Sequence, residues 1–119
     1  MQVTLIDDDE AVRGSLASLL RAVGHAVSVF ASAEAFLASD GVEVPDCLIL
    51  DVNMPNMSGP DLFERMKGLG STVPVLFITA SKDDALRSRL LSVGAKGCLF
   101  KPFNDEALLC ALQAAARGI

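Results

Sequence analysis

Five short apolar runs recur along the chain, and a longer stretch of residues separates each run from the next. The runs are rich in Val, Ile, Leu and Phe, which is typical of strands buried on both faces of a parallel sheet. The predicted strands lie at residues 2–7, 26–30, 47–50, 75–78 and 98–100.

The stretches that follow these runs predict five helices. Three of them carry apolar residues at the spacing of one helix face. These stripes are Val12, Leu16, Leu19, Leu20 and Val23 in the first helix, Leu86, Leu90 and Val93 in the fourth, and Leu108, Leu109 and Leu112 in the fifth.

Capping residues predict where the helices begin and end. Ser32 and Asn104 are expected N-caps, and Ser58-x-x-Asp61 and Ser81-x-x-Asp84 resemble capping boxes. Pro60 is expected at the first helical position. We expect a turn at 41–46 and helix ends at or near Gly24, Gly68, Gly70, Gly94 and Gly118.

Five strand-helix units predict a single doubly wound α/β sheet. Parallel neighbours require right-handed crossovers, so helices should cover both faces, two on one face and three on the other. The common order for a five-stranded parallel sheet of this kind is 2-1-3-4-5, the flavodoxin-like (βα)5 arrangement. We therefore expect one domain that spans residues 1–119.

Composition narrows the class of protein. Apolar residues make up 51% of the chain, which excludes intrinsic disorder, and the net charge of -5 disfavours direct binding to nucleic acid or to anionic membranes. The sequence has neither an apolar run near the roughly 18 residues of a membrane span nor a basic secretion signal at its start, so we expect a cytoplasmic protein. Cys47, Cys98 and Cys110 are expected to be small buried residues, because their spacing fits neither a metal site nor a disulfide framework.

Four of the five runs end on residues that can bind metal or phosphate. Asp7 and Asp8 follow the first run, Asp51 the third, Thr79 the fourth and Lys101 the fifth. The carboxyl ends of parallel strands lie at one edge of the sheet, where ligands bind. We therefore expect these side chains to converge, although they are far apart in sequence.

Three carboxylates in one crevice repel one another and require a cation. Oxygen ligands suit Mg²⁺, with Mn²⁺ as the alternative, and His25 is expected at the opposite end of the second strand. A carboxylate beside such a metal can attack phosphorus and form an aspartyl phosphate. Asp51 is the best candidate nucleophile because it ends the central strand. Lys101 would neutralise charge on the phosphoryl group, Thr79 would hydrogen-bond one of its oxygens, and the small Ala80 leaves room for it.

These strand ends resemble the receiver domain of bacterial two-component response regulators, the CheY-like superfamily. The runs MPNMSG and KPF are most similar to receivers that precede a helix-turn-helix output domain. The resemblance implies a signalling phospho-acceptor, not a separate enzyme, whose activities are self-phosphorylation and autodephosphorylation. It covers the whole chain and rests on Ile6-Asp7-Asp8-Asp9-Glu10, Asp51, Met54-Pro55-Asn56-Met57-Ser58-Gly59, Ile78-Thr79-Ala80 and Lys101-Pro102-Phe103.

The resemblance also implies roles for single residues. Asp51 would accept phosphate from a sensor histidine kinase or a histidine phosphotransfer protein. Asp8 would bind Mg²⁺ directly, Asp7 largely through water, and the backbone carbonyl of Asn53 would complete the protein ligands. Phosphorylation would shift the domain between two conformations and change its binding to a partner or an output domain.

Further positions would tune or transmit the signal. Asn53 and Ser81 would set the lifetime of the phosphate, and the Lys101-Pro102 bond would be cis. Cys98 departs from the family, which usually has Tyr or Phe there, so transmission is expected to depend on backbone shift or on Phe100 or Phe103. A homodimer through the fourth helix, fifth strand and fifth helix is a further expectation.

Two other functions fit the pattern less well. A small Mg²⁺-dependent phosphatase commonly needs a second acid two residues after the nucleophile, where this chain has Asn53. A flavodoxin-like cofactor binder is disfavoured, because the Asp-rich loop after the first run would repel a cofactor phosphate. Taken singly, Asp51, Thr79 or Lys101 would be an ordinary cap, strand end or surface charge, and only their combination predicts a site.

Overall fold

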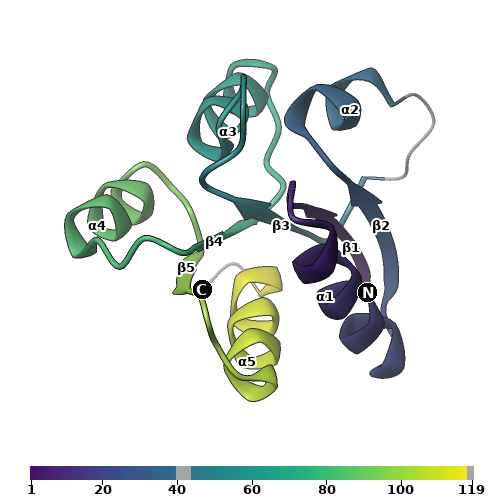
Figure 1. Ribbon diagram of the computed structural model, residues 1–119. Helices are drawn as coiled ribbons and strands as arrows, with labels where there is room; N and C mark the ends of the chain where they lie inside the picture. The colour runs from purple at the N-terminus through teal and green to yellow at the C-terminus, as the bar shows by residue number, and fades with distance from the viewer. Residues whose placement is uncertain (40–43, 118–119) are drawn as a thin grey trace.

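Five parallel strands form one sheet in the order β2-β1-β3-β4-β5, which confirms the predicted topology (Figure 1). The structure is a computed structural model, and it describes residues 1–39 and 44–117. In the register of the sheet Ile6 pairs with Leu50, and Thr79 pairs with Phe100. The strands are β1 (Gln2–Ile6), β2 (Ala26–Phe30), β3 (Cys47–Asp51), β4 (Val75–Thr79) and β5 (Gly97–Phe100).

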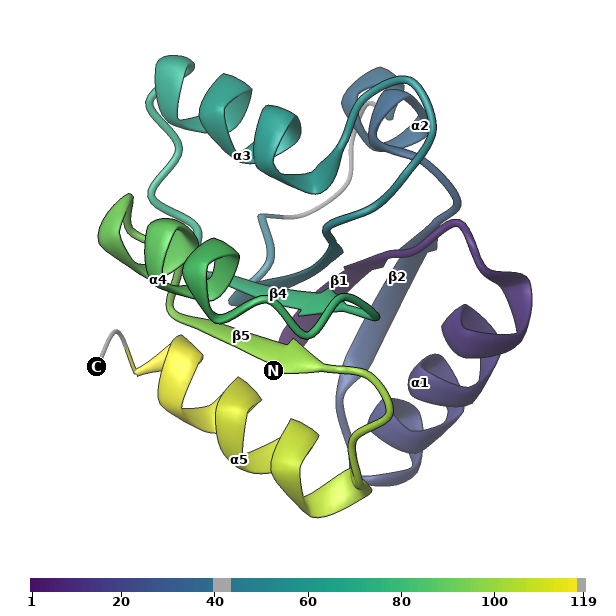
Figure 2. The same ribbon diagram turned by 60° about the vertical axis from the view of Figure 1, so that its left-hand side comes forward.

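Helices cover both faces of this sheet in the predicted two-to-three division. Figures 1 and 2 show α1 and α5 on one face and α2, α3 and α4 on the other. The helices are α1 (Glu10–Ala22), α2 (Ala33–Ala38), α3 (Gly59–Gly68), α4 (Asp84–Ser92) and α5 (Asp105–Ala116). Among the residues described, no helix has both the length and the hydropathy that crossing a membrane requires.

The core is divided by the sheet into two apolar clusters. One packs Leu20 and Leu108 from α1 and α5 against Leu5 and Ile49. The other packs side chains of α2, α3 and α4 against the opposite face of the sheet, which includes the fully buried Phe77. Residues 47–51 and 75–79 are buried along their whole length, as expected for strands covered on both sides.

Most of the predicted helix starts are confirmed. Ser32 and Asn104 are the N-caps of α2 and α5, and Ser58 forms a reciprocal capping box with Asp61 at the start of α3. Pro60 lies one position later than expected, because α3 begins at Gly59.

The predicted start of α4 is wrong. Its N-cap is Asp83, whose Oδ1 accepts a hydrogen bond from the backbone N–H of Leu86 at 3.1 Å. Ser81 instead donates its backbone N–H to Thr79 Oγ1 at 3.1 Å. Asp83 suits the cap position, because its negative charge also interacts favourably with the positive end of the helix dipole.

This assignment predicts unequal effects of two alanine substitutions. Asp83→Ala should lower the free energy of unfolding by about 1 kcal/mol, because it leaves an N–H of the first turn without its cap. Ser81→Ala should change it by less than about 0.5 kcal/mol, because only the backbone of Ser81 is used. Urea unfolding followed by circular dichroism checks both values, and a larger loss for Ser81→Ala would contradict the assignment.

Several finer expectations are also corrected. Val93 is 43% exposed because it is the C-cap residue of α4, and Cys110 is exposed on α5 instead of buried. The expected end of α3 is confirmed, because its last residue is Gly68 and Gly70 follows with a φ of 84°. Leu109 is only half-buried. Part of the expected turn, residues 40–43, and the predicted helix end at Gly118 lie outside the described residues.

Candidate functional site

The five predicted side chains meet at the carboxyl edge of the sheet. Asp7 directly follows β1, Asp51 and Thr79 are the last residues of β3 and β4, and Lys101 directly follows β5. Strand β3 lies between β1 and β4, so Asp51 is central in the group. The sheet order therefore brings together residues that are up to 94 positions apart in the chain.

Three carboxylates form the acidic part of this site. Ligand oxygens of Asp7, Asp8 and Asp51 all lie within 4.8 Å of one another. Asp7 and Asp51 are buried, whereas Asp8 is exposed. A compact set of oxygen donors with one side open to solvent fits Mg²⁺ or Mn²⁺, which keep several water ligands, better than it fits zinc.

Lys101 is the cation of the site. Its Nζ lies 3.0 Å from Asp7 Oδ2 and 3.5 Å from Asp51 Oδ1. Burial lowers the pKa of the ammonium, but the hydrogen bond to Asp7 and the charge of Asp51 outweigh burial and raise that pKa above its usual value. Lys101 is therefore charged at neutral pH and bridges two of the acidic groups.

The environment of Asp51 disfavours the ionised form of its carboxyl group. Burial, followed by the charge of Asp7, raises the pKa of Asp51 to about 7, although Lys101 and a backbone hydrogen bond from Asn53 act in the opposite direction. Burial and the negative charge of Asp7 thus make the carboxylate form of Asp51 unfavourable. A metal cation bound beside Asp51 would offset this unfavourable energy, which makes Asp51 a strong candidate ligand.

Asp7 and Asp8 differ in how firmly they are held. Asp7 Oδ1 accepts the backbone N–H of Asp9 at 2.8 Å, and Oδ2 accepts Lys101 at 3.0 Å. Asp8 projects into solvent from the next position. Asp7 is therefore fixed by two partners, whereas the separate roles expected for Asp7 and Asp8 at a metal stay predictions.

The hydroxyl of Thr79 is oriented by two donors. Thr79 Oγ1 accepts hydrogen bonds from the backbone N–H of Ser81 at 3.1 Å and from Asn53 Nδ2 at 3.3 Å. These bonds use its lone pairs, so its proton remains to be donated to a phosphoryl oxygen. The bond from the Asn53 side chain was not predicted, and it links the ends of β3 and β4.

The other predicted positions surround this group. Ala80 and Ser81 are exposed on the loop after β4, and the Lys101-Pro102 bond is cis as predicted. Cys98 is a buried member of the apolar core between the sheet and α4, and burial raises the pKa of its thiol. The ring of Phe100, next to the site lysine, lies 5.6 Å from the guanidinium carbon of Arg87 on α4.

Two residues that support the site were not predicted. A Cβ built on Gly59 would lie 2.2 Å from the backbone oxygen of Asp51, so α3 can begin there only with glycine. Arg13 Nη1 donates to the backbone oxygen of Asp7 at 2.7 Å. The glycine of the MPNMSG run was a possible signal for the first, but nothing in the spacing of α1 indicated the second.

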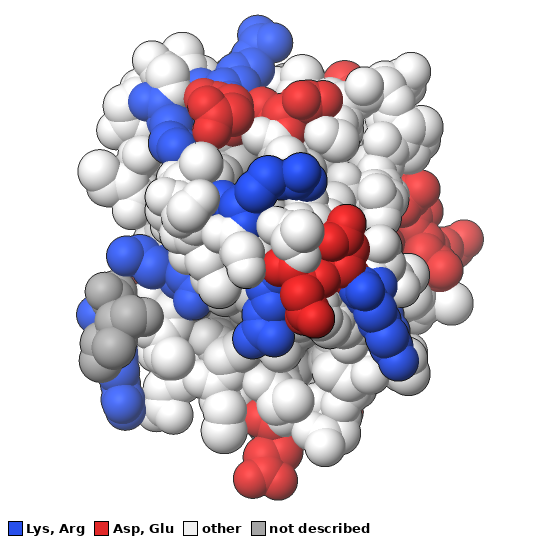
Figure 3. All heavy atoms as spheres, turned by 90° about the vertical axis from the view of Figure 1, so that its left-hand side faces the viewer, with Lys and Arg blue, Asp and Glu red and all other residues white. Residues whose placement is uncertain are grey.

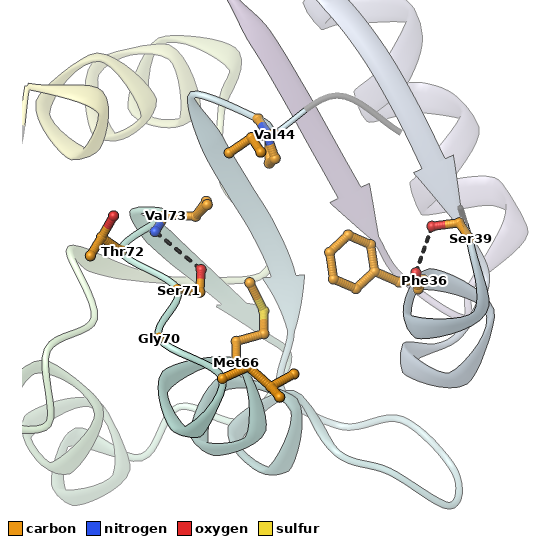
Figure 4. A pocket seen from close by; sticks show the side chains of 10 residues that line it. Phe36, Ser39, Val44, Met66, Gly70, Ser71, Thr72 and Val73 are labelled. Atoms are coloured by element: carbon orange, nitrogen blue, oxygen red, sulfur yellow. Dashed lines mark hydrogen bonds between the residues drawn. The ribbon is translucent and has the colours of Figure 1, made fainter. Parts of the chain in front are cut away.

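Two of the hollows formed by the described residues lie at opposite ends of the strands. An apolar groove of about 540 Å³ adjoins the site and is lined by Val12, Leu16, Lys101, Pro102 and Phe103, among others. The second hollow, about 440 Å³, lies between α2 and the α3–β4 connection and is bordered by Phe36, Val44, Met66 and Val73 (Figure 4). Only the first adjoins the cluster of Asp7, Asp51 and Lys101, because the second is at the amino-terminal ends of the strands.

Comparisons with known proteins place the chain in a family. Residues 3–113 match the model of the response regulator receiver domain. The chain is 40% identical over 115 residues to the response regulator protein TodT of Pseudomonas putida, an alignment that covers 97% of this chain and 51% of TodT. The chain therefore spans about half the length of such relatives.

Solved structures agree with this result. Full-length FixJ from B. japonicum has a TM-score of 0.88 and 38% identity, with 98% of this chain and 57% of that chain covered. The chemotaxis protein CheY4 of Vibrio cholerae has a TM-score of 0.84 and 33% identity, with 96% of this chain and 97% of that chain covered. The chain belongs to the receiver domain family of two-component response regulators, and its role is in signalling.

Proposed function

We propose that this receiver accepts a phosphoryl group on Asp51 from a sensor histidine kinase or a histidine phosphotransfer protein. The observation that carries the proposal is the position of Lys101 Nζ, 3.0 Å from Asp7 and 3.5 Å from Asp51. An acidic cluster alone would bind a cation. A fixed ammonium within the cluster also provides positive charge for a phosphoryl group on Asp51.

The transfer step follows from the side chains present. An Asp51 carboxylate oxygen forms a bond to phosphorus while the bond from phosphorus to the donor's imidazole nitrogen breaks, and the electron pair leaves with the imidazole. Lys101 then pairs with one phosphoryl oxygen, and the Thr79 hydroxyl donates its proton to another. Dephosphorylation is the attack of water on the same phosphorus, which restores the carboxylate.

The acidic residues are the proposed metal ligands. Asp7, Asp8, Asp51 and the backbone carbonyl of Asn53 would hold Mg²⁺, or Mn²⁺ in its place. When bound, the metal supplies positive charge to the phosphoryl oxygens during transfer. Burial of Asp7 and Asp51 keeps these groups apart from bulk water and strengthens that interaction.

The apolar groove beside Lys101 is the proposed docking place of the phosphate donor. It is formed by α1 and the loop between β5 and α5, directly next to the mouth of the site. A donor helix seated there would bring its phosphohistidine to Asp51.

The proposed location of this reaction is the cytoplasm. The free thiols of Cys47, Cys98 and Cys110 support that location, because disulfides are rare there.

The proposed response is a change of conformation that starts at Thr79. The backbone N–H of Lys101 donates to Thr79 O at 2.7 Å, so a shift of Thr79 towards a phosphoryl group moves the end of β5 as well. Phe100 lies in β5 and contacts Arg87 of α4. This contact offers a route to α4 that does not need an aromatic residue at Cys98.

The face formed by α4, β5 and α5 is the proposed homodimer surface. Figure 3 shows basic and acidic side chains interspersed on this face. A twofold contact can pair the basic groups of one copy with the acidic groups of the other. The exposed charged residues of these elements and their connection are Asp84, Arg87, Arg89, Lys96, Asp105 and Glu106.

The proposed output is transcription control in which another part of the protein contacts DNA. FixJ of Bradyrhizobium diazoefficiens, 39% identical over 116 residues, is a transcriptional regulatory protein of which this chain covers 56%. The net charge of -5 makes the receiver itself a poor ligand for nucleic acid.

Acetyl phosphate tests the proposed function. With Mg²⁺, the protein should gain one phosphoryl group that hydroxylamine removes, and Asp51→Asn should reduce its formation by at least about a hundredfold because the amide cannot attack phosphorus. Intact-protein mass spectrometry measures the product. Asp84→Asn is a matched control, since Asp84 is exposed on α4 and should not affect labelling.

Two results would contradict this function. Equal labelling of Asp51→Asn and the parent protein would show that the phosphate is elsewhere. Sustained turnover of small phosphomonoesters would favour a phosphatase, which we do not expect, because the amide of Asn53 cannot protonate a leaving group and instead donates to Thr79.

A further inference from the structure

Arg13 contacts the peptide bond that joins the two acidic residues after β1. Its Nη1 donates to the backbone oxygen of Asp7 at 2.7 Å, the shortest side-chain contact to that residue. The Asp7 oxygen belongs to the planar peptide unit that ends at the nitrogen of Asp8. A hydrogen bond to this oxygen therefore fixes the plane from which Asp8 departs.

The start of α1 places Arg13 for this contact. Asp9 is the N-cap of α1, and the backbone N–H of Arg13 donates to Asp9 O at 2.9 Å. Long side chains on helices point back towards the amino-terminal end. A residue in the second turn of α1 therefore reaches the β1–α1 loop without distortion of the helix.

The other polar atoms of Asp7 already have partners. Its backbone N–H donates to Phe30 O at 3.2 Å, Oδ1 accepts from Asp9, and Oδ2 accepts from Lys101. Strand β1 ends at Ile6, so the carbonyl of Asp7 has left the sheet ladder. The Arg13 guanidinium takes the place of the missing strand donor, so each polar atom of Asp7 has a hydrogen-bond partner.

We propose that Arg13 is a positioning residue of the metal site, which orients the Asp7–Asp8 peptide and so holds both carboxylates ready for Mg²⁺. This inference rests on the proposed function. Two effects of the guanidinium oppose each other: its hydrogen bond orders the ligands, whereas its positive charge repels a cation. The bond dominates, because it is short and acts directly on the ligand loop, while the charge is partly exposed to solvent and screened.

Calorimetric titration with Mg²⁺ and no phosphate donor tests the proposal. Arg13→Ala should weaken Mg²⁺ binding roughly tenfold, the usual size of an effect on residues that orient metal ligands. Arg13→Lys should restore part of the affinity, because its ammonium can still donate one hydrogen bond but lacks the planar fork. Phosphorylation by acetyl phosphate should then need more Mg²⁺ for half-maximal rate, with a nearly unchanged rate at saturation.

Arg21→Ala is the matched control. Arg21 lies on the same helix and also donates to a backbone oxygen, that of Val27 at 3.2 Å, but at the far edge of the sheet. Arg21→Ala should lower the free energy of unfolding in urea by about as much as Arg13→Ala does, without a change in Mg²⁺ affinity. Unchanged or tighter Mg²⁺ binding in Arg13→Ala would overturn the inference, whereas no Mg²⁺ binding by the parent protein would overturn the proposed function itself.

Discussion

Replacing Gly59 with alanine is expected to lower the free energy of unfolding by about 3 kcal/mol and to disturb the nucleophile. The new Cβ would lie 2.2 Å from Asp51 O and 3.1 Å from Val52 Cα, and both are backbone atoms that cannot rotate away. Either α3 or the end of β3 must move. The small gain in helix propensity from alanine, under about 1 kcal/mol, does not offset this.

Gly68→Ala provides the control within the same helix. A Cβ on Gly68 would meet nothing within 4 Å, so this variant should be as stable as the parent or slightly more stable. Urea unfolding gives both free energies, and labelling by acetyl phosphate reports the geometry of Asp51. A Gly59→Ala protein with parental stability and labelling would show that the close approach is unimportant.

The predictable part of this structure is the part set by local patterns. The apolar runs located every strand to within about one residue, because strands buried on both faces leave a nearly continuous apolar signal. The order of the sheet then followed from handedness and from the common five-stranded topology. The converging side chains were predictable for the same reason, since each one is the last residue of a strand or lies within two residues of its end.

The errors occurred where two residues compete for one local role. Ser81 and Asp83 are both good N-caps, and only the path of the chain after β4 decides between them. Cys110 and Val93 are apolar by type, but the helix positions turn Cys110 outwards and leave Val93 as a half-exposed cap. A stripe of apolar residues indicates one helix face without fixing its width.

The unpredicted supports of the site depend on contacts between separate segments. Gly59 is required by its distance to the Asp51 carbonyl, and Arg13 acts on a carbonyl that has left the sheet. Neither contact involves a periodicity or a motif of side-chain chemistry. Sequence patterns thus predicted the side chains that converge at the carboxyl ends of the strands and missed the groups that hold the backbone around them.

Asp51→Asn is expected to stabilise the metal-free protein at alkaline pH by about 2 to 4 kcal/mol. The pKa of Asp51 is raised from 3.8 to about 7, chiefly by burial and by the charge of Asp7. The folded protein therefore favours the protonated carboxyl, and this stabilisation is complete below pH 3.8 and disappears as the pH rises through 7. Asparagine is neutral and nearly isosteric, so it does not carry the cost of the buried charge.

The difference between the two proteins should depend on pH. In urea unfolding without divalent metal, the advantage of Asp51→Asn should be largest at pH 8 and should shrink by more than half at pH 5, where the parent carboxyl is protonated in the fold. Glu34→Gln is the control, because Glu34 is exposed on α2 and should shift stability by less than about 0.5 kcal/mol at either pH.

Addition of Mg²⁺ at pH 8 should then remove most of the advantage of Asp51→Asn. A cation bound to the folded protein compensates the charge of Asp51, so the parent gains stability with metal concentration, by about 2.7 kcal/mol at a hundred times the dissociation constant. Asp51→Asn has lost one ligand and should gain much less. If the metal-free parent were as stable as Asp51→Asn at pH 8, the acidic cluster would carry no stored repulsion, and the preference of Asp51 for a metal and a phosphoryl group would need another cause.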